Sequence, residues 1–390
     1  MAITGTNEKN TGRIRLGMVG GGRGAFIGAV HRLAARMDDQ YEFVAGALSS
    51  DPARSRASGK ELGLVPERNY ADFAAMAKAE ARRADGIEVV SIVTPNHMHY
   101  PAAKAFVEAG IHVVCDKPLS LNLKEALALK KLLAKNPKVI FALTHNYSGY
   151  PMIRQAKAMV AAGELGEIRL VQGEYPQDWL TTDIEKSGQK QAAWRTDPKR
   201  SGAGGCVGDI GTHTYQLGCF VSGLKLNELS ADLTSFVKGR KLDDNAHVML
   251  RYRGGARGMI WASQVAPGHE NGLKLRVYGT RGGLEWVQAD PNYLWYTPFG
   301  EPKRLITRGG AGSNAAAARV TRVPPGHPEG YLEGFANIYT EVARAVKARR
   351  AGKRVEAEVD FPGIADGVAG MAFIEACVKS SAKNGKWTKV

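Results

Sequence analysis

The 390-residue sequence has little of what marks a membrane-embedded, secreted or metal-binding protein. No apolar run reaches the roughly 18 residues that a membrane span needs, and the polar N-terminal segment lacks the apolar core of a signal peptide. Cysteine is scarce, and no Cys-x-x-Cys pair occurs among the four, Cys115, Cys206, Cys219 and Cys377. This argues against a zinc site and a disulfide scaffold. We therefore expect a soluble cytoplasmic protein without a bound metal.

Acidic residues are outnumbered by basic ones, 38 against 53, which gives a formal net charge of +15. Such an excess can indicate a nucleic-acid partner. Here, however, the basic residues are spread along the chain with acidic residues between them, and no helix-turn-helix or RNA-binding motif is present. We expect neither nucleic acid nor a membrane as a partner, and a diffuse positive field would instead help to gather anionic cofactors.

The first 145 residues alternate between predicted strands and predicted helices. The strands are expected at 14–19, 42–48, 89–94, 111–115 and 139–143, with helices at 71–84, 100–109 and 123–134. This alternation predicts a parallel sheet with helices on its faces. We place a polar leader at residues 1–12 and an α/β domain, a doubly wound Rossmann sheet that binds a dinucleotide, at residues 13–145.

The pattern changes in the second half of the chain to longer strands rich in aromatic and β-branched residues. They are expected at 168–175, 229–237, 246–252, 256–264, 274–278 and 283–287, and glycine turns at 253–255 and 279–282 suggest hairpins. We assign residues 146–390 to an α+β domain with an antiparallel sheet, for substrate binding and oligomerisation. A surface loop is expected at 309–318, and helices at 332–349 and 363–384. The exposed face of such a sheet favours a homodimer or a homotetramer.

A glycine-rich segment follows the first predicted strand directly and precedes a helical pattern. Gly20 and Gly22 occupy the first two positions of Gly-x-Gly-x-x-Gly, but Ala25 stands at the third. Backbone N–H groups at such a strand-to-helix turn bind phosphate groups. The segment therefore predicts a pyrophosphate site, with expected cofactor contacts from Gly20, Gly22, Arg23, Gly24, Ala25 and Phe26.

The end of the second strand decides between NAD and NADP. An acidic residue there binds the ribose 2′-hydroxyl, whereas a basic residue accommodates a 2′-phosphate. The chain has Ser49 and Ser50 at this position, followed by Asp51 and Arg54. Ser49, Ser50 and Arg54 are expected to contact the cofactor. NAD is slightly favoured, and NADP stays open.

Polar residues follow three other predicted strands at the same edge of the sheet, where open α/β sheets bind ligands. Asp116-Lys117-Pro118 follows strand 111–115, and the proline restricts Lys117 to an extended conformation. A lysine beside a nicotinamide can hydrogen-bond an alcohol oxygen, although an exposed strand-end lysine is the alternative. Further cofactor contacts are expected from Thr94, Asn96, His97, His99, Asp116, Lys117 and Asn146.

The segment from Gly204 to His213 is glycine-rich and places Asp209 and His213 four residues apart. In a helix this spacing puts both side chains on one face, where they can share a proton or bind a polar substrate. A structural hydrogen bond between the two is the other interpretation.

Four more residues are candidate substrate contacts. Trp194 could pack on a sugar ring and Arg195 could bind vicinal hydroxyl groups. Asp178, beside Trp179, is a similar polar and aromatic pair, and His327 lies in a turn constrained by glycine and proline. Each is equally compatible with an ordinary surface or core position.

Taken together, the segments 19–22, 94–99, 116–118, 146–147, 205–213 and 326–331 resemble, in order, the motifs of the Gfo/Idh/MocA family, named for glucose-fructose oxidoreductase and inositol dehydrogenase. The resemblance implies a Rossmann domain followed by an open-faced antiparallel sheet that often forms an oligomer interface. It also implies oxidation or reduction of a secondary alcohol of a sugar or cyclitol with NAD(H) or NADP(H). The chain departs from the family pattern at Ala25 and at Ser49. It also departs at Asp116, because the family usually has a glutamate at that position.

The resemblance also implies roles for three residues. Lys117 matches the catalytic lysine, Asp209 the substrate-binding aspartate and His213 the catalytic histidine, and Lys117 and His213 could exchange roles. The expected function is an NAD(P)-dependent dehydrogenase that converts a secondary hydroxyl of an inositol or monosaccharide to a ketone or lactone. A dehydrogenase of glycosides or anhydrosugars is one alternative. A catalytically inactive cofactor-binding sensor is another, against which the presence of all three residues argues.

Overall fold

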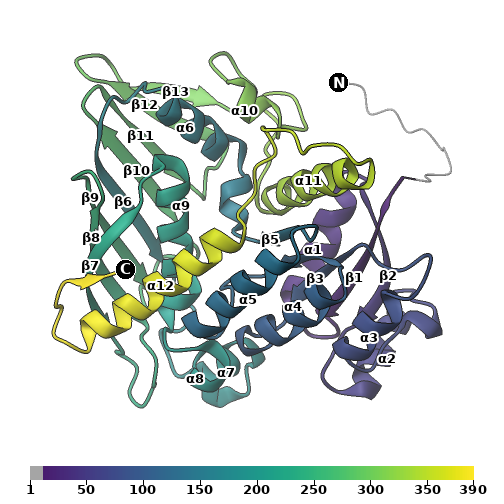
Figure 1. The fold of residues 1–390 in the computed structure, drawn as a ribbon. Coiled ribbons are helices and arrows are strands. Elements are labelled where there is room, and N and C mark those ends of the chain that lie inside the picture. The colour runs from purple at the N-terminus through teal and green to yellow at the C-terminus, as the bar shows by residue number, and fades with distance from the viewer. Residues whose placement is uncertain (1–11) are drawn as a thin grey trace.

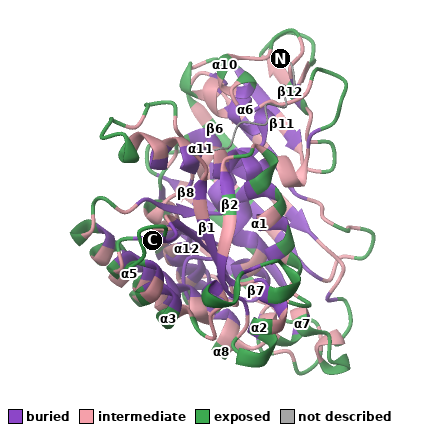
Figure 2. Ribbon diagram, turned by 90° about the vertical axis from the view of Figure 1, so that its right-hand side faces the viewer, coloured by how far each residue is buried: buried purple, intermediate pink, exposed green. Residues whose placement is uncertain are grey.

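The computed structural model describes residues 12–390, so the expected leader at 1–12 lies outside the described residues except for Gly12. Two sheets organise the described chain (Figure 1). Figure 2 shows that buried residues concentrate along the strands and on the inner sides of the helices, while exposed residues lie at the periphery. None of the helices within residues 12–390 combines the length and the apolar character needed to cross a bilayer.

The first sheet of the described chain has five parallel strands in the order β2-β1-β3-β4-β5. Its strands are β1 (Ile14–Gly20), β2 (Tyr41–Ala47), β3 (Val89–Val93), β4 (His112–Cys115) and β5 (Phe141–Leu143). The helices between them are α1 (Phe26–Met37), α2 (Pro52–Glu61), α3 (Phe73–Glu80), α4 (His99–Glu108) and α5 (Leu123–Lys135). The predicted doubly wound sheet is confirmed. The strand order reverses between β1 and β3, and a crevice for a ligand opens at such a reversal.

Helix α2 was not predicted, and its composition explains why. The buried residues of this helix are Ser55, Ser58 and Gly59, so no apolar stripe marks its inner face. Ser55 compensates through hydrogen bonds, since its hydroxyl accepts from the Leu48 N–H and donates to the Tyr70 carbonyl. Specific polar contacts therefore hold this helix against the sheet.

The second sheet of the described chain has nine strands in the order β13-β12-β11-β10-β6-β9-β8-β7-β14. They are β6 (Ile168–Pro176), β7 (Leu226–Thr234), β8 (Asn245–Tyr252), β9 (Arg257–Ser263), β10 (Lys274–Gly279), β11 (Gly282–Val287), β12 (Tyr293–Pro298), β13 (Arg304–Thr307) and β14 (Thr388–Lys389). The predicted antiparallel sheet is confirmed, with one difference: β6 and β9 pair in parallel. Strands β12, β13 and β14 were not predicted.

One face of the second sheet packs on helices that include α9 (Thr212–Ser222), and the other face is open. A row of directly opposed residues crosses this open face from Met249 and Met259 to Trp295 and Leu305. These four apolar side chains are all exposed. Between them the same row contains the polar residues Gln172, Arg276 and Glu285. The expected oligomer stays a prediction, and this open face is the surface to which it applies.

The last two long helices return to the first sheet instead of staying with the second. Helix α11 (Tyr331–Arg350) packs against α1 (Figure 1), and its residue Tyr339 bonds to both His31 and Ser91. Helix α12 (Ile364–Ser381) packs on α5 and on β7 and so bridges the two sheets. Residues 146–390 are therefore not spatially separate from the first domain.

The predicted surface loop at 309–318 is partly wrong. Its end forms the short helix α10 (Ala315–Ala318), which packs against α6 (Pro151–Ala161). Asn314 caps α10, and its backbone N–H donates to Gln155 Oε1 at 2.7 Å. A glycine-rich composition indicated a loop, but this capping contact orders the end of the segment.

Candidate active site

A cavity of about 1000 Å³ opens at the carboxyl edge of the parallel sheet and is lined by both halves of the chain. Most of the predicted site residues meet there. They are Gly20, Gly22, Arg23, Ala25, Phe26, Ser49, Ser50, Arg54, Thr94, Asn96, His97, Asp116, Lys117, Asn146, Trp194, Arg195, Asp209 and His213. Residues far apart in the chain thus surround one space, as the strand-end rule predicts.

The glycine loop between β1 and α1 needs its glycines for steric reasons. Gly20 has a φ of 81°, which a side chain would strain. A Cβ on Gly22 would lie 2.7 Å from the Leu48 carbonyl oxygen, and one on Gly28 only 2.3 Å from the Gly21 Cα. Gly28 therefore provides the close packing of helix on loop that a glycine at the position of Ala25 would otherwise supply.

Unpartnered polar atoms show that the cavity fits a nicotinamide dinucleotide. Thr94 Oγ1, His97 Nδ1 and Asn146 Nδ2 are buried, have no hydrogen-bond partner among the described residues, and belong to residues that line the cavity. Buried polar groups normally have partners. The ribose hydroxyls and the carboxamide of a nicotinamide nucleotide offer the donors and acceptors that these atoms lack.

At the end of β2, the structure directs the side chain of Asp51 away from the cofactor cavity. Asp51 does not line the cavity, because its Oδ1 accepts a hydrogen bond from the Arg54 N–H at 2.7 Å and caps α2. Ser49, Ser50 and the Arg54 side chain remain in the lining. Asp51 therefore does not supply the carboxylate expected to favour NAD, although another acidic residue, Asp72, lines the same cavity.

Lys117 and Asp209 form the polar centre of the cavity. The Lys117 Nζ donates to Asp209 Oδ1 at 2.9 Å and to the Asp209 carbonyl at 2.5 Å. Gln264 donates to the other carboxylate oxygen at 2.9 Å, and Arg195 Nε lies 3.3 Å from it. Burial by itself raises the pKa of the Asp209 carboxyl. The charges of Lys117 and Arg195 and the hydrogen bonds from Lys117 and Gln264 together lower the pKa by more than burial raises it, so the net pKa lies below the ordinary range of an aspartate. Asp209 is thus a carboxylate that holds two cations in place.

The expected contact between Asp209 and His213 does not form. Asp209 lies in a π-helical turn, Val207–Gly211, that precedes α9. The backbone of this turn forms i to i+5 hydrogen bonds and so departs from the α-helix on which the expected contact was based. The carboxylate of Asp209 binds Lys117 and Gln264 instead of His213.

His213 lines the cavity and lies in an aromatic environment. Its ring centroid is 5.3 Å from that of His145 and 5.0 Å from that of Tyr147, both edge-on. Burial, followed by the charges of Lys117 and His145, lowers the pKa of His213 well below its ordinary value. At neutral pH the imidazole is therefore neutral and has a nitrogen lone pair available for a proton.

The buried histidines make the protein sensitive to acid. Burial lowers the pKa of His31 to about 4 and that of His145 to about 3, whereas both protonate near pH ~6.5 in an unfolded chain. Below that pH the unfolded state binds more protons, so each residue lowers the free energy of unfolding by about 1.4 kcal/mol per pH unit. In urea denaturation, these two residues together should lower the free energy of unfolding by about 3 kcal/mol between about pH 6.5 and about pH 5. A constant free energy over this interval would contradict the assignment.

Sequence reasoning missed a hydrogen-bonded network that lines the substrate side of the cavity. The hydroxyls of Tyr147 and Tyr175 lie 2.5 Å apart, and Tyr175 donates to Asn271 Oδ1 at 2.8 Å. Gln177 donates to the same amide oxygen at 2.8 Å. Tyr147 follows the predicted contact Asn146 directly and could have been included, but no local pattern singled out Asn271.

Four predicted contacts lie outside the cavity lining. His99 is buried, and its ring nitrogens lie 2.6 Å from the Pro118 carbonyl and 2.9 Å from the Thr94 carbonyl, so it holds two strand ends together. Gly24 and His327 are exposed. Asp178 binds the Gly268 N–H, while its neighbour Trp179 lines the cavity. For His99, Asp178 and His327 the reason is the same: a position next to a site does not fix where a side chain points.

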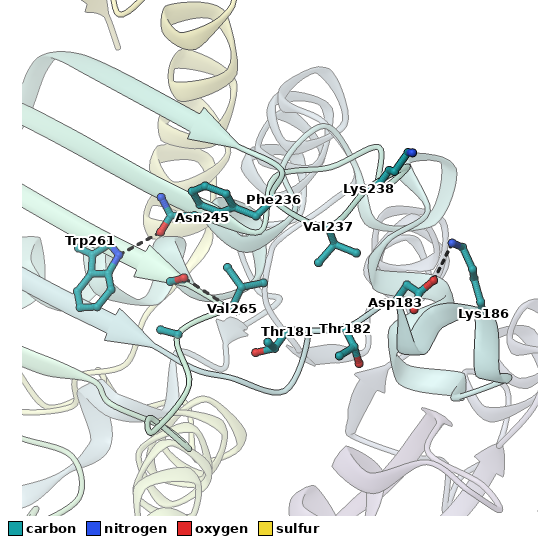
Figure 3. Close-up of a pocket in the computed structure, with 12 residues that line it drawn as sticks. Thr181, Thr182, Asp183, Lys186, Phe236, Val237, Lys238, Asn245, Trp261 and Val265 are labelled. Atoms are coloured by element: carbon teal, nitrogen blue, oxygen red, sulfur yellow. Dashed lines mark hydrogen bonds and ion pairs between the residues drawn. The ribbon is translucent and has the colours of Figure 1, made fainter.

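A second groove, of about 950 Å³, lies beside the second sheet (Figure 3). Trp261 Nε1 donates to Asn245 Oδ1 at 3.1 Å, and Lys186 pairs with Asp183 at 2.7 Å. Two pairs of its polar groups are thus bonded to each other, and the groove has neither a glycine loop nor a strand-end lysine. We therefore place the active site in the first cavity.

Comparison with known proteins agrees with this architecture. The family model described as "Oxidoreductase family, NAD-binding Rossmann fold" matches residues 14–145, and the "GFO/IDH/MocA C-terminal domain" matches residues 153–285. A solved oxidoreductase from Sinorhizobium meliloti is 61% identical, with a TM-score of 0.89 over 97% of this chain and 99% of that chain.

Two further relatives bear on chemistry. An inositol dehydrogenase homolog from Azotobacter vinelandii, solved with NADH and myo-inositol, is 38% identical, with a TM-score of 0.90 over 97% of this chain and 98% of that one. Levoglucosan dehydrogenase from Pseudarthrobacter phenanthrenivorans is 26% identical over 70% of this chain and 73% of its own length. With the Rossmann sheet, the glycine loop and the lysine centre, these matches show that the chain is an NAD-binding oxidoreductase of the Gfo/Idh/MocA family.

Proposed function

We propose that this protein oxidises one secondary hydroxyl group of a cyclitol or monosaccharide to a ketone or lactone. The observation that carries the proposal is the meeting of Lys117, Asp209 and neutral His213 in a cavity that also contains the glycine loop. The similarity to the Azotobacter vinelandii protein solved with NADH and myo-inositol supports this substrate class.

The geometry supports a division of roles between the three residues. Lys117 donates a hydrogen bond to the substrate oxygen and stabilises the negative charge that develops on it. Asp209 holds the Lys117 side chain in the cavity, because its Oδ1 lies 2.9 Å from the Lys117 Nζ. His213 accepts the hydroxyl proton, a role for which a neutral imidazole is suited. Bound NAD supplies the nicotinamide C4 that accepts the hydride from the carbon atom.

The hydrogen bonds of the two residues favour His213 over Lys117 as the base. The Lys117 Nζ already donates to the carboxylate and the carbonyl of Asp209, whereas the neutral imidazole of His213 has a lone pair that can accept a proton. The aromatic and amide groups of Trp194, Gln177 and Asn271 line the same cavity and suit a neutral polyhydroxy ring.

The second candidate is a dehydrogenase of anhydrosugars or glycosides, which the similarity to levoglucosan dehydrogenase favours. It requires the same proton and hydride chemistry at a ring hydroxyl. The two candidates differ only in the ring that occupies the substrate end of the cavity.

Formation of reduced nicotinamide cofactor across a substrate panel tests the proposal. The panel contains inositols, aldoses, levoglucosan and methyl glycosides. Each is tested with NAD⁺ and with NADP⁺, because Ser49, Ser50 and Arg54 line the cavity and Asp51 does not. Turnover of an inositol or aldose is expected. Turnover of levoglucosan or glycosides alone would support the second candidate. Tight NADH binding without any turnover would contradict both and indicate a sensor.

A further inference from the structure

Lys190 brings a positive charge from the second half of the chain to the glycine loop. It is the first residue of α7 (Lys190–Arg195), in the connection between β6 and α9, and it lines the active-site cavity. A Cβ built on Gly24 would lie 3.9 Å from the Lys190 Nζ. The ammonium group therefore lies beside the turn that approaches a dinucleotide pyrophosphate.

Two other cationic side chains close to this loop, Arg23 and Arg32, already have partners. Arg23 forms an ion pair with Glu61. Arg32 donates to the Gly21 carbonyl oxygen at 2.9 Å. Lys190, by contrast, takes part in none of the side-chain hydrogen bonds or ion pairs found within residues 12–390. It is thus an available cation at a place where two phosphate charges would lie.

Helix α7 connects this lysine to the substrate end of the cavity. Three residues of the same six-residue helix, Gln191, Trp194 and Arg195, line the cavity as well. The Gln191 Oε1 accepts from Arg195 at 2.6 Å and from Trp194 at 3.2 Å, and Arg195 reaches Asp209. A displacement of the Lys190 end of this short helix therefore moves the Arg195 end.

We propose that Lys190, which reaches the glycine loop from the second half of the chain, binds the pyrophosphate of NAD beside this loop, and that this contact positions α7 for the substrate. Cofactor binding then orders the helix that carries Trp194 and Arg195. The first part depends only on NAD binding, whereas the effect on substrate rests on the proposed function.

Direct binding measurements test the first part without turnover. We expect Lys190→Met to raise the dissociation constant of NADH about tenfold, because it removes one charge-assisted phosphate contact. Titration calorimetry with ADP-ribose, which keeps the pyrophosphate but lacks nicotinamide, should show the same loss. Lys190→Arg should restore most of the affinity, and higher salt should narrow the difference between Lys190→Met and the unmodified protein.

A matched control lies in the same connection. Lys186 is also exposed, but it pairs with Asp183 and lines the second groove (Figure 3). Lys186→Met should leave the dissociation constants of NADH and ADP-ribose unchanged. The proposal would be overturned if Lys190→Met bound NADH and ADP-ribose as tightly as the unmodified protein, or if Lys186→Met lost as much affinity as Lys190→Met.

The second part, the effect on substrate, is tested by steady-state kinetics. Lys190→Met should raise KM for the substrate at saturating NAD⁺. An unchanged KM would limit Lys190 to cofactor binding and contradict the coupling.

Discussion

Replacing Lys117 with methionine is expected to lower kcat for alcohol oxidation by about 10³-fold. The substitution keeps a similar side-chain volume but removes the ammonium that lies 2.9 Å from Asp209 and faces the cavity. Without the ammonium group, this position has no cation to stabilise the negative charge that develops on the substrate oxygen. Steady-state kinetics with saturating NAD⁺, alongside NADH titration, separate this loss from a loss of cofactor binding.

The Lys117→Met protein should fold, because Asp209 keeps two of its partners, Gln264 and Arg195. Lys104→Met is a suitable control, since Lys104 is exposed and pairs only with Glu108 on the same helix. Its kcat should equal that of the unmodified protein. Full turnover in Lys117→Met with intact NADH binding would refute the assigned role.

The second large effect is expected at His213. His213→Asn should lower kcat by about 10²-fold or more, because the asparagine amide cannot accept the hydroxyl proton. The loss should be greatest where the imidazole of the unmodified enzyme is neutral. Since burial lowers the pKa of His213, that range extends below the ordinary histidine pKa. The pH profile of kcat/KM measures this range.

His145 provides the matched control for this substitution. Its ring is buried and lies 5.3 Å from that of His213, but it does not line the cavity. His145→Asn should keep most of the activity while changing the acid sensitivity of folding. An equal loss of kcat in both variants would show that packing around the rings, rather than proton transfer to His213, limits the rate.

Much of the first domain was predictable because its signals are local. Buried parallel strands appear as apolar runs, and a glycine loop between strand and helix marks the phosphate turn. Lys117 was identifiable from its position at the end of a strand. Helix α2 and strands β12 to β14 were missed, since α2 has a polar inner face and β14 has only two residues.

Contacts between the predicted residues were less predictable. The spacing of Asp209 and His213 suggested a pair, yet a π-helical turn directs Asp209 to Lys117, 92 residues earlier in the chain. Tyr175 and Asn271 join the site from a strand and a loop 96 residues apart. No short-range pattern encodes such a partner, because it depends on how the two sheets pack.

Local sequence signals specify the doubly wound sheet, the cofactor loop and the residue types available for chemistry, because backbone sterics and apolar periodicity act over a few neighbouring residues. Which of those residues meet depends on the packing of the whole molecule. It pairs Asp209 with Lys117, returns α11 to the first sheet and brings Lys190 to the glycine loop. These outcomes depend on burial and charge compensation between segments distant in the chain, which only the packed molecule determines.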